Sequence, residues 1–251
     1  MNIVACVKRV PSTEAVAKPT ADGTGLDSTG NQYMISFYDE IAVEEAVKTK
    51  EALGAGEVTV LSMGSKGGTK EIRECLAKGG DKAVVLVDEE WESRDARATA
   101  KALTAQIQSM GADLVFMGRV ATDRDNAAVG PMVGTYLGWP CVTDVVSLEL
   151  GDGAGTAKVE TEAGVETVSF SLPAIITCQK GLNEPRYAGL KGIMAAKKKP
   201  LEEVAPEVCE NQMTAVEVAL PPERQEGRIV GEGADAVPAL IDALRNEAKV
   251  L

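Results

Sequence analysis

The sequence predicts an α/β fold in which a parallel β-sheet is flanked by helices, with an added meander of β-hairpins and an extended C-terminal arm. Apolar runs of strand length alternate with amphipathic segments of helix length, at intervals of about 30 residues, as in consecutive β-α-β units. In the stretch 113–131, a short apolar run breaks at Gly118 into a polar turn and then continues with helical periodicity. After residue 140 this alternation stops, and glycine turns separate short β-like runs.

Short apolar runs mark the parallel strands, which we predict at residues 3–7, 57–63, 83–87 and 113–117. Helices are predicted from residue 39 to Gly54, at 69–78, at 94–110, and after Asp125 or Asn126, both favourable N-cap residues. Pro11 prevents the first strand from continuing, and residues 33–37 form a short extended piece. Right-handed crossovers between parallel strands make this a Rossmann-like sheet with helices on its faces.

Three β-like segments follow at residues 142–150, 157–161 and 165–172, and the glycine-containing turns between them predict a meander. Residues 173–179 form another apolar strand. The segment 180–210 lacks the periodicity of a core element, so we expect it at the surface or in an interface. Residues 211–233 are polar and rich in Pro and Gly, which predicts an extended arm before a closing helix at about 234–249.

Composition excludes several classes of function. A chain of 251 residues with 45% apolar content can bury a sizeable core. The net charge of −12 argues against nucleic acid or an anionic membrane as the main partner. The sequence contains no His, which excludes a triad hydrolase and a His-zinc enzyme. We expect a protein that binds a ligand, with neither catalytic residues nor a metal site of its own.

The cysteines and the N-terminus predict a location. The five cysteines are odd in number and scattered, which argues against a disulfide framework or a metal knuckle and favours buried thiols: Cys6, Cys75, Cys141, Cys178 and Cys209. No apolar run is long enough to span a membrane, and residues 1–8 are too short for the apolar region of a signal peptide. We expect a cytoplasmic protein that does not insert into a membrane.

Three loops are expected to meet at the carboxyl edge of the sheet, at residues 8–14, 63–68 and 118–126. Ligands of open parallel sheets bind at this edge, where the amides and dipole of the next helix favour an anion. Four glycines in these loops would let backbone amides approach a phosphate: Gly64, Gly67, Gly68 and Gly118. None of the loops spells a complete phosphate-binding motif, so ordinary turn glycines are the alternative.

The acidic pair Asp123 and Asp125 allows three interpretations. The carboxylates could act as general acid and base, hold Mg²⁺, or cap the following helix. No second acidic cluster accompanies them in a strand context, so we favour capping and positioning of a ligand.

Two surface motifs predict contacts with partners. The non-periodic loop 182–190 mixes apolar residues with Pro185, Arg186 and Tyr187, the composition of an interface anchor, although burial in the chain's own core is the alternative. The run Lys197-Lys198-Lys199 would attract phosphate or an acidic surface, but most such runs are solvated faces.

Taken together, these two motifs resemble part of a known family. The recognition-loop signature of the beta subunit of electron transfer flavoprotein (ETF) is similar to Leu182-Asn183-Glu184-Pro185-Arg186-Tyr187, followed by Leu190, Ile193-Met194 and Lys197-Lys198-Lys199. The agreement runs in one order over residues 1–200. It includes Val7-Lys8-Arg9-Val10, the acidic and apolar segment 39–47, Gly118-Arg119 through Asp123-x-Asp125, Gly138-Trp139-Pro140 and Leu172-Pro173-Ala174.

The resemblance implies an electron carrier that forms a heterodimer with an alpha subunit and shares a redox FAD with it. The beta subunit itself would hold a second nucleotide, either AMP or, in the bifurcating branch, FAD; a bifurcating FAD would add oxidation of NADH. The domains would be an α/β nucleotide-binding domain at 1–200 and, at 201–251, an arm and helix that pack on the alpha subunit. Carried over by position, the nucleotide site comprises Cys6, Ser36, Phe37, Tyr38, Asp39, Met63, Gly118, Arg119, Val120, Ala121, Thr122, Asp123, Asp125, Asn126, Ala127, Ala128 and Val129.

The recognition loop would bind an acyl-CoA dehydrogenase or a similar flavoprotein dehydrogenase, with Leu190 as the apolar anchor. A quinone oxidoreductase or another acceptor would be the second redox partner. The implied partner-binding residues are Leu182, Asn183, Glu184, Pro185, Arg186, Tyr187, Leu190, Ile193 and Met194.

Departures from the family pattern bear on the nucleotide. The AMP-binding pattern has Asn-Gln-Thr where this chain has Ala127-Ala128-Val129, which removes side chains that contact the phosphate. Arg119 and Val10-Pro11-Ser12-Thr13 instead look like the bifurcating branch, with Ser12 and Ser36 in place of its usual Asp and Asn. The sequence therefore leaves AMP and FAD open and leans toward FAD. The alternative function is a stand-alone nucleotide-binding regulatory protein of the universal-stress type, which would use the same sheet and loops.

Overall fold

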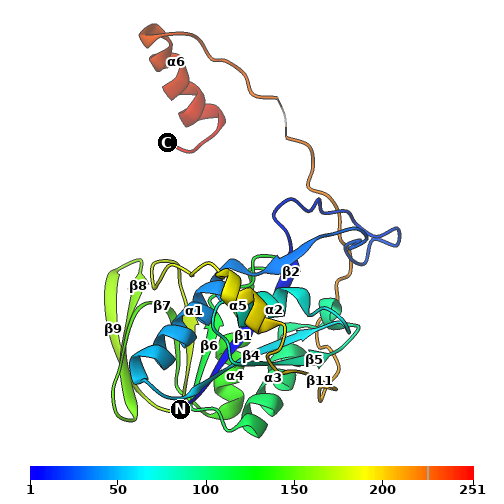
Figure 1. The fold of residues 1–251 in the computed structure, drawn as a ribbon. Helices are drawn as coiled ribbons and strands as arrows, with labels where there is room; N and C mark the ends of the chain where they lie inside the picture. The colour runs from blue at the N-terminus through cyan, green and yellow to red at the C-terminus, as the bar shows by residue number, and fades with distance from the viewer. Residues whose placement is uncertain (225) are drawn as a thin grey trace. The chain divides into compact units, whose positions relative to one another are not determined.

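A nine-stranded, mostly parallel sheet carries the fold, which confirms the predicted α/β class. The computed structural model describes residues 1–224 and 226–251. The strands lie in the order β11-β5-β4-β1-β6-β10-β7-β8-β9, and all neighbours are parallel except in the meander β7-β8-β9 at one edge (Figure 1). No helix in the described ranges is long and apolar enough to cross a membrane.

The strands of this sheet are β1 (Asn2–Val7), β4 (Glu57–Gly64), β5 (Lys82–Val87), β6 (Leu114–Gly118), β7 (Cys141–Leu150), β8 (Ala154–Thr161), β9 (Gly164–Ser171), β10 (Ala174–Cys178) and β11 (Leu201–Val204). Helices are α1 (Phe37–Leu53), α2 (Lys70–Ala77), α3 (Ala96–Met110), α4 (Val129–Leu137) and α5 (Leu190–Ala196). The four predicted parallel strands, the three meander strands and the strand at 173–179 are thus confirmed, with small shifts at their ends.

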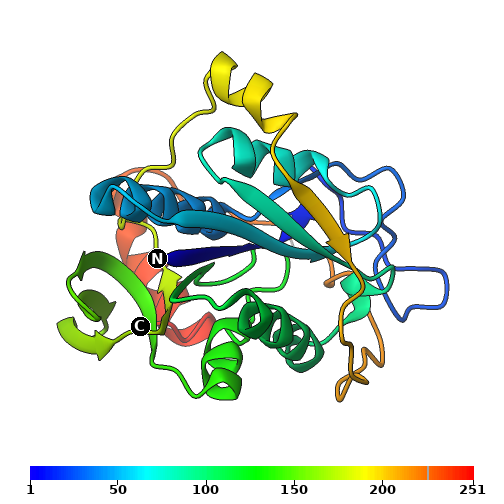
Figure 2. The same ribbon diagram turned by 60° about the horizontal axis from the view of Figure 1, so that its bottom comes forward.

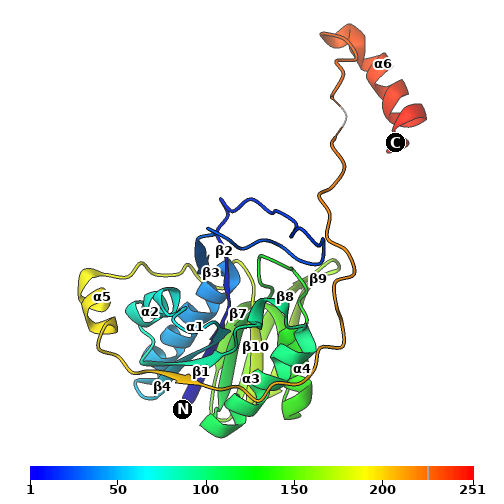
Figure 3. The same cartoon turned by 90° about the vertical axis from the view of Figure 1, so that its right-hand side faces the viewer.

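Two apolar cores lie on opposite faces of the sheet. Alternate residues of β1 divide between them, because successive side chains of a strand point to opposite faces. Ile3 and Val7 pack with α1 and α2, whereas Val4 and Cys6 pack with α3 and α4. Figures 2 and 3 show this layering, with α1 and α2 on one side of the strands and α3 and α4 on the other.

Glycine ends α1 at Gly54, as the sequence predicts, and it also ends α3 and α4, with Gly138 after α4 at φ 69°. Gly54 after α1 and Gly111 after α3 adopt the left-handed conformation, at φ 65° and 59°. Asp95 begins α3, where its carboxylate accepts a hydrogen bond of 2.7 Å from the amide of Ala98.

The predicted start of the fourth helix is wrong. α4 begins at Val129 rather than after Asp125 or Asn126, and no side chain caps it. Asp125 and Ala127 have φ values of 55° and 51°, so the backbone of residues 125–127 turns through the left-handed region and is still a loop.

Several short elements were missed from the sequence. β2 (Arg9–Pro11), directly after β1, was not predicted; it pairs antiparallel with β3 (Tyr33–Ile35), which lies within the extended piece predicted at 33–37. The 3₁₀ turn η1 (Trp91–Ser93) and the helix α5 are too short to show a period. β11 is an edge strand with two exposed glutamates, and only its pairing with β5 makes it a strand.

The chain separates into two compact units. The first comprises residues 1–17 and 27–216 and holds the sheet; the second comprises 18–26 and 217–251. Within the second unit, the amide of Val218 donates to the carbonyl of Gly23 at 2.7 Å. Its closing helical region runs through η2 (Ala234–Ala236), α6 (Val237–Asp242) and a π-helical turn, η3 (Ala243–Glu247), which agrees with the predicted helix at about 234–249.

Candidate functional site: a cleft at the carboxyl edge of the sheet

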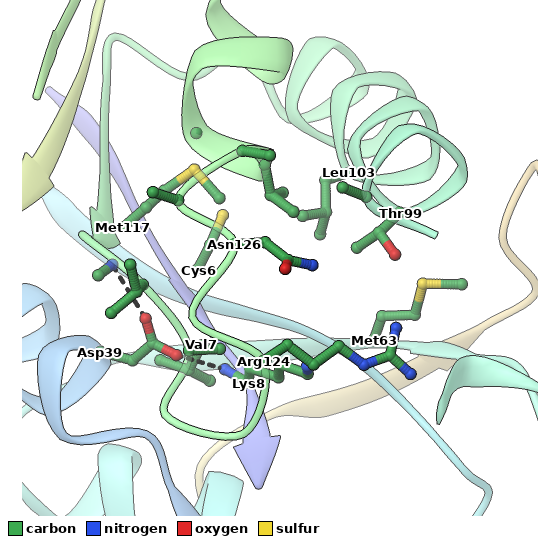
Figure 4. A pocket seen from close by; sticks show the side chains of 18 of the residues that line it. Cys6, Val7, Lys8, Asp39, Met63, Thr99, Leu103, Met117, Arg124 and Asn126 are labelled. Atoms are coloured by element: carbon green, nitrogen blue, oxygen red, sulfur yellow. Dashed lines mark hydrogen bonds between the residues drawn. The ribbon is translucent and has the colours of Figure 1, made fainter. Parts of the chain in front are cut away.

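A cleft lies where β1, β4 and β6 end, between these strands and the helix α3. The empty space, including the part open to solvent, is about 920 Å³. Its lining includes eleven of the residues expected to bind a nucleotide: Cys6, Asp39, Met63, Gly118, Arg119, Val120, Ala121, Asn126, Ala127, Ala128 and Val129. Figure 4 shows Cys6, Met117 and Asn126 from the strand ends and the following loop, with Thr99 and Leu103 of α3 facing the same space.

Asp39 holds two edges of the cleft together. Its carboxylate accepts a hydrogen bond of 2.8 Å from the amide of Lys8, after β1, and one of 2.9 Å from the amide of Gly118, at the end of β6 (Figure 4). Burial raises the pKa of this carboxyl to about 7, while the two amides and the charge of Lys8 act in the opposite direction. Asp39 thus lines the cleft, but both of its carboxylate oxygens already accept hydrogen bonds from amides of the same chain.

Two glycines at the cleft allow close packing that a side chain would prevent: Gly118, against Asp39, and Gly130, against Thr177. A Cβ at Gly118 would overlap the Asp39 carboxylate and lie 2.9 Å from the Asp39 amide nitrogen. A Cβ at Gly130 would lie 2.7 Å from the Thr177 side chain. Both positions therefore admit only glycine without movement of their neighbours.

Three residues expected at the site, Ser36, Phe37 and Tyr38, do not line the cleft. The hydroxyl of Ser36 is buried, accepts from the amide of Thr122 at 3.3 Å and lies 3.4 Å from the carbonyl of Val120. Phe37 and Tyr38 begin α1; Tyr38 packs against the core, and Phe37 is exposed. Ser36 thus supports the loop 118–122, and none of these three residues lines the cleft.

The acidic pair does not cap a helix, contrary to our expectation. Asp123 forms an ion pair of 2.6 Å with Lys8, and Asp125 lies in the left-handed turn, where its amide donates to the carbonyl of Ala121 at 2.9 Å. Asp123 therefore joins the loops after β1 and β6, and α4 begins beyond both residues.

The glycines of the loop 63–68 do not line the cleft. The amides of Lys66 and Gly67 donate to the carboxylates of Glu89 and Glu203, at 2.9 and 3.3 Å. Gly68 lies against the guanidinium of Arg9. Only Met63 of this loop reaches the cleft, so turn formation is the better explanation for these three glycines.

The connection after β5 and the helix α3 supply lining residues that the sequence did not predict: Trp91 and Arg94 from the connection, and Ala96, Thr99 and Leu103 from α3. The same rule that selected the other loops would have found Trp91 and Arg94, because β5 is also parallel and ends at the same edge. The α3 residues carry no polar motif and are recognised only from their position.

The cations around the cleft have partners in the chain. Arg94 pairs with Asp88 at 2.6 Å, and Arg119 pairs with Asp144 at 2.7 Å. Arg124 donates to the carbonyls of Arg94 and Glu92. The burial of Cys6 and the charge of Asp39 raise the pKa of that thiol well above its ordinary value, so Cys6 is neutral near pH 7. The site offers an apolar wall and paired cations, but no activated nucleophile.

Comparison with known proteins identifies the chain's relatives. The family model described as electron transfer flavoprotein domain matches residues 24–208. The electron transfer flavoprotein subunit beta of Bacillus subtilis (strain 168) is 35% identical over 260 residues, covering all of both chains. The mitochondrial subunit beta of Oryza sativa subsp. indica is 37% identical over 257 residues, again with full coverage, and that of Syntrophomonas wolfei is 35% identical over 251 residues, covering 100% of this chain and 98% of the relative.

This chain belongs to the electron transfer flavoprotein beta-subunit family. The family and the function that the sequence analysis implied are therefore confirmed, and the universal-stress alternative is set aside. A beta subunit has an alpha subunit as its partner, and a flavoprotein carries a flavin.

The residues that the sequence assigned to partner binding fall into two groups, those that contact the chain itself and those that are exposed. Asn183 and Arg186 bind carboxylates of α1 in the same chain. Leu182 packs against the core, whereas Tyr187, Leu190, Ile193 and Met194 are exposed. Of the expected partner-binding residues, the apolar ones after residue 186 are thus free to meet another protein, and Asn183 and Arg186 are already occupied.

Proposed function

We propose that this beta subunit, with its alpha subunit, carries electrons through FAD between a flavoprotein dehydrogenase and a second redox partner. The observation that carries the proposal is the cleft at the carboxyl edge, which combines an apolar wall with paired cations and lacks an activated nucleophile. Such a site binds a cofactor and leaves the redox chemistry to it. One FAD would be shared with the alpha subunit, and a second nucleotide would occupy the beta cleft.

The backbone and side chains of the cleft are suited to a nucleotide. Ala127 has a positive φ of 51° and Ala128 is right-handed, at φ −104°, and backbone that alternates in this way forms a nest of main-chain amides. Such a nest, followed by a helix N-terminus, favours a phosphate. Cys6, Met63 and Leu103 provide an apolar surface for a ring. The phosphate would be held by amides and Asn126 rather than by the side chains of residues 127–129.

We favour FAD over AMP in the beta cleft. The small side chains at 127–129 leave space beside the amides, and Arg119 lies in the lining. Denaturing the purified heterodimer and measuring the released nucleotides by absorbance at flavin wavelengths and by chromatography tests this choice. Two flavins per heterodimer are expected. One flavin with one AMP would overturn the FAD assignment, and a heterodimer without flavin would overturn the electron-carrier function.

The donor is proposed to be an acyl-CoA dehydrogenase or a similar flavoprotein dehydrogenase, and the acceptor a quinone oxidoreductase or another redox protein. The exposed apolar side chains of residues 187–194 support a small, transient contact of the kind that electron-transfer partners use. The C-terminal segment 201–251 would pack on the alpha subunit, and the complex would work in the cytoplasm.

A beta-site FAD would also allow oxidation of NADH. Titrating the purified heterodimer with NADH and following flavin absorbance, with and without a dehydrogenase, tests this part separately. Loss of flavin absorbance with NADH alone is the expected result for a bifurcating beta FAD. Unchanged absorbance would mean that the complex transfers electrons between its partners without oxidising NADH.

A further inference from the structure

The segment 183–199, which we call the recognition segment, is attached to the body of the protein at both ends and exposed in the middle. Tyr187 is 97% exposed and Leu190 is 75% exposed. The ends are held by polar contacts to α1 and α2, whose residues lie far away in the sequence. Figure 2 shows α5, in yellow, projecting from the layer of α1 and α2.

The first attachment is a guanidinium held between two carboxylates of α1. Glu44 is only 6% exposed and accepts from Nε of Arg186 at 2.8 Å, from its Nη2 at 3.0 Å and from its main-chain amide at 3.1 Å. Glu51 accepts from Nη1 and Nη2 at 2.7 and 2.9 Å. These bonds raise the pKa of Arg186 above its ordinary value. Planar, charge-assisted contacts of this type fix geometry as well as distance.

Asn183 strengthens this attachment one turn earlier along α1. Its side-chain amide donates to the carbonyl of Ile41 at 3.1 Å and to the carboxylate of Glu45 at 2.9 Å. Glu45 is buried. Two buried glutamates on one helix therefore bind the recognition segment, and losing Arg186 would leave the buried charge of Glu44 without compensation.

The second attachment is on α2. Nη1 of Arg73 donates to the carbonyls of Ala196 and Lys199 at 2.6 and 2.9 Å. Nζ of Lys199 donates to the carbonyls of Leu76 and Gly80 at 2.9 and 2.6 Å. Residues 187–195 thus form a short connection whose two ends are hydrogen-bonded to α1 and α2.

We propose that Glu44 is a positioning residue for partner docking: by holding Arg186, it sets the conformation in which Tyr187 and Leu190 are presented to the dehydrogenase. The proposal rests on the proposed electron-carrier function. A segment that is ordered before contact loses less conformational entropy on binding, so a rigid support increases affinity without touching the partner. Glu44 lies under the loop and not in the docking surface.

Trypsin tests the attachment independently of electron transfer. The Arg186–Tyr187 bond is a trypsin site whose arginine is held by Glu44. In the intact heterodimer, Glu44→Gln should increase the rate of cleavage at this bond about tenfold, because the buried one of the two charged partners of the guanidinium is lost and only the exposed Glu51 remains. Glu40→Gln is the matched control, since Glu40 is on the same helix but pairs with Lys78 at 2.9 Å. Cleavage after Lys197 and Lys198 in each sample is the internal reference.

Reduction by the dehydrogenase tests the positioning role. For Glu44→Gln, the KM for the flavoprotein is expected to rise about five- to tenfold with little change in kcat, as for loss of preorganisation. The rate with a small redox dye and the nucleotide content should match those of the Glu40→Gln control. If Glu44 acts through Arg186, the double variant Glu44→Gln/Arg186→Gln should be no worse than Arg186→Gln alone.

The outcomes separate the two claims. Unchanged cleavage at Arg186–Tyr187 in Glu44→Gln would overturn the attachment. Faster cleavage with an unchanged KM would overturn the positioning role. A wild-type heterodimer that no acyl-CoA dehydrogenase reduces would overturn that donor assignment in the proposed function, while the proteolysis would still decide whether Glu44 holds the segment.

Discussion

The cleft and the recognition segment both depend on carboxylates of α1, but they use them differently. Asp39, in the first turn, binds two main-chain amides. Glu44, further along, binds the side chain and amide of Arg186. The cleft is therefore held mainly through the backbone and the recognition segment mainly through side chains. An added Cβ is therefore expected to disrupt the cleft, whereas removal of a charge is expected to release the recognition segment.

The largest expected effect is in the cleft. Gly118→Ala should abolish retention of the beta nucleotide and lower the free energy of unfolding by about 1–3 kcal/mol, since the new Cβ would overlap the Asp39 carboxylate. Nucleotide content after gel filtration and urea unfolding measure the two effects.

Gly64→Ala is the matched control for that change. Gly64 lies at the end of β4, which is separated from β6 by β1, and a Cβ there meets no atom within 4 Å. The control should keep its nucleotide. Equal behaviour of the two alanine variants would contradict a backbone-built cleft.

Asp39→Asn should weaken nucleotide binding roughly tenfold. The two oxygens of Asp39 each accept one amide, from Lys8 and Gly118, and Asn offers only one acceptor. Isothermal titration of nucleotide into the stripped heterodimer would measure this. An unaltered dissociation constant would show that the two loops keep their spacing without Asp39.

The same residue gives a pH dependence with a definite sign. Burial raises the pKa of Asp39 from 3.8 to about 7, so between about pH 4 and 7 the folded chain keeps a proton that the unfolded chain has lost. This contribution to the free energy of unfolding therefore falls as the pH rises through that window and is constant above it. Subtracting the profile of Asp39→Asn from that of the wild type should isolate the slope; parallel profiles would rule it out.

In the recognition segment, Leu190→Ala should slow reduction by an acyl-CoA dehydrogenase roughly five- to thirtyfold, the usual cost of truncating an interface anchor. Stopped-flow absorbance of the flavin measures the rate, and bound nucleotide should not change. Val165→Ala is the control, because Val165 is also an exposed apolar residue but lies on β9. Equal rates for both variants and wild type would refute the anchoring role.

The smallest effect separates neighbouring lysines. Lys199→Ala should cost about 1 kcal/mol of unfolding free energy, because the carbonyls of Leu76 and Gly80 lose their donor. Lys198→Ala, at an exposed position, should change it by less than about 0.5 kcal/mol. Thermal unfolding compares the two variants. If Lys199→Ala also changed the free energy of unfolding by less than about 0.5 kcal/mol, the whole run 197–199 would be a solvated face.

Local signals in the sequence determined the α/β class, the four central parallel strands, the hairpin meander and the ends of α1 and α3. Apolar period, strand length and left-handed glycines depend mainly on near neighbours in the chain. All of these features follow from short stretches of the amino-acid sequence.

Only the tertiary structure decided which polar groups meet. Glu44 and Glu45 read as ordinary acidic helix residues, and their burial follows from Arg186 and Asn183, which are far away in the sequence. Gly67 and Gly118 look alike as loop glycines, but the amide of one is taken by Glu203 and the amide of the other by Asp39. β11 is a strand only because β5 leaves an edge for it. Long-range pairing decides these cases, and a linear pattern does not record it.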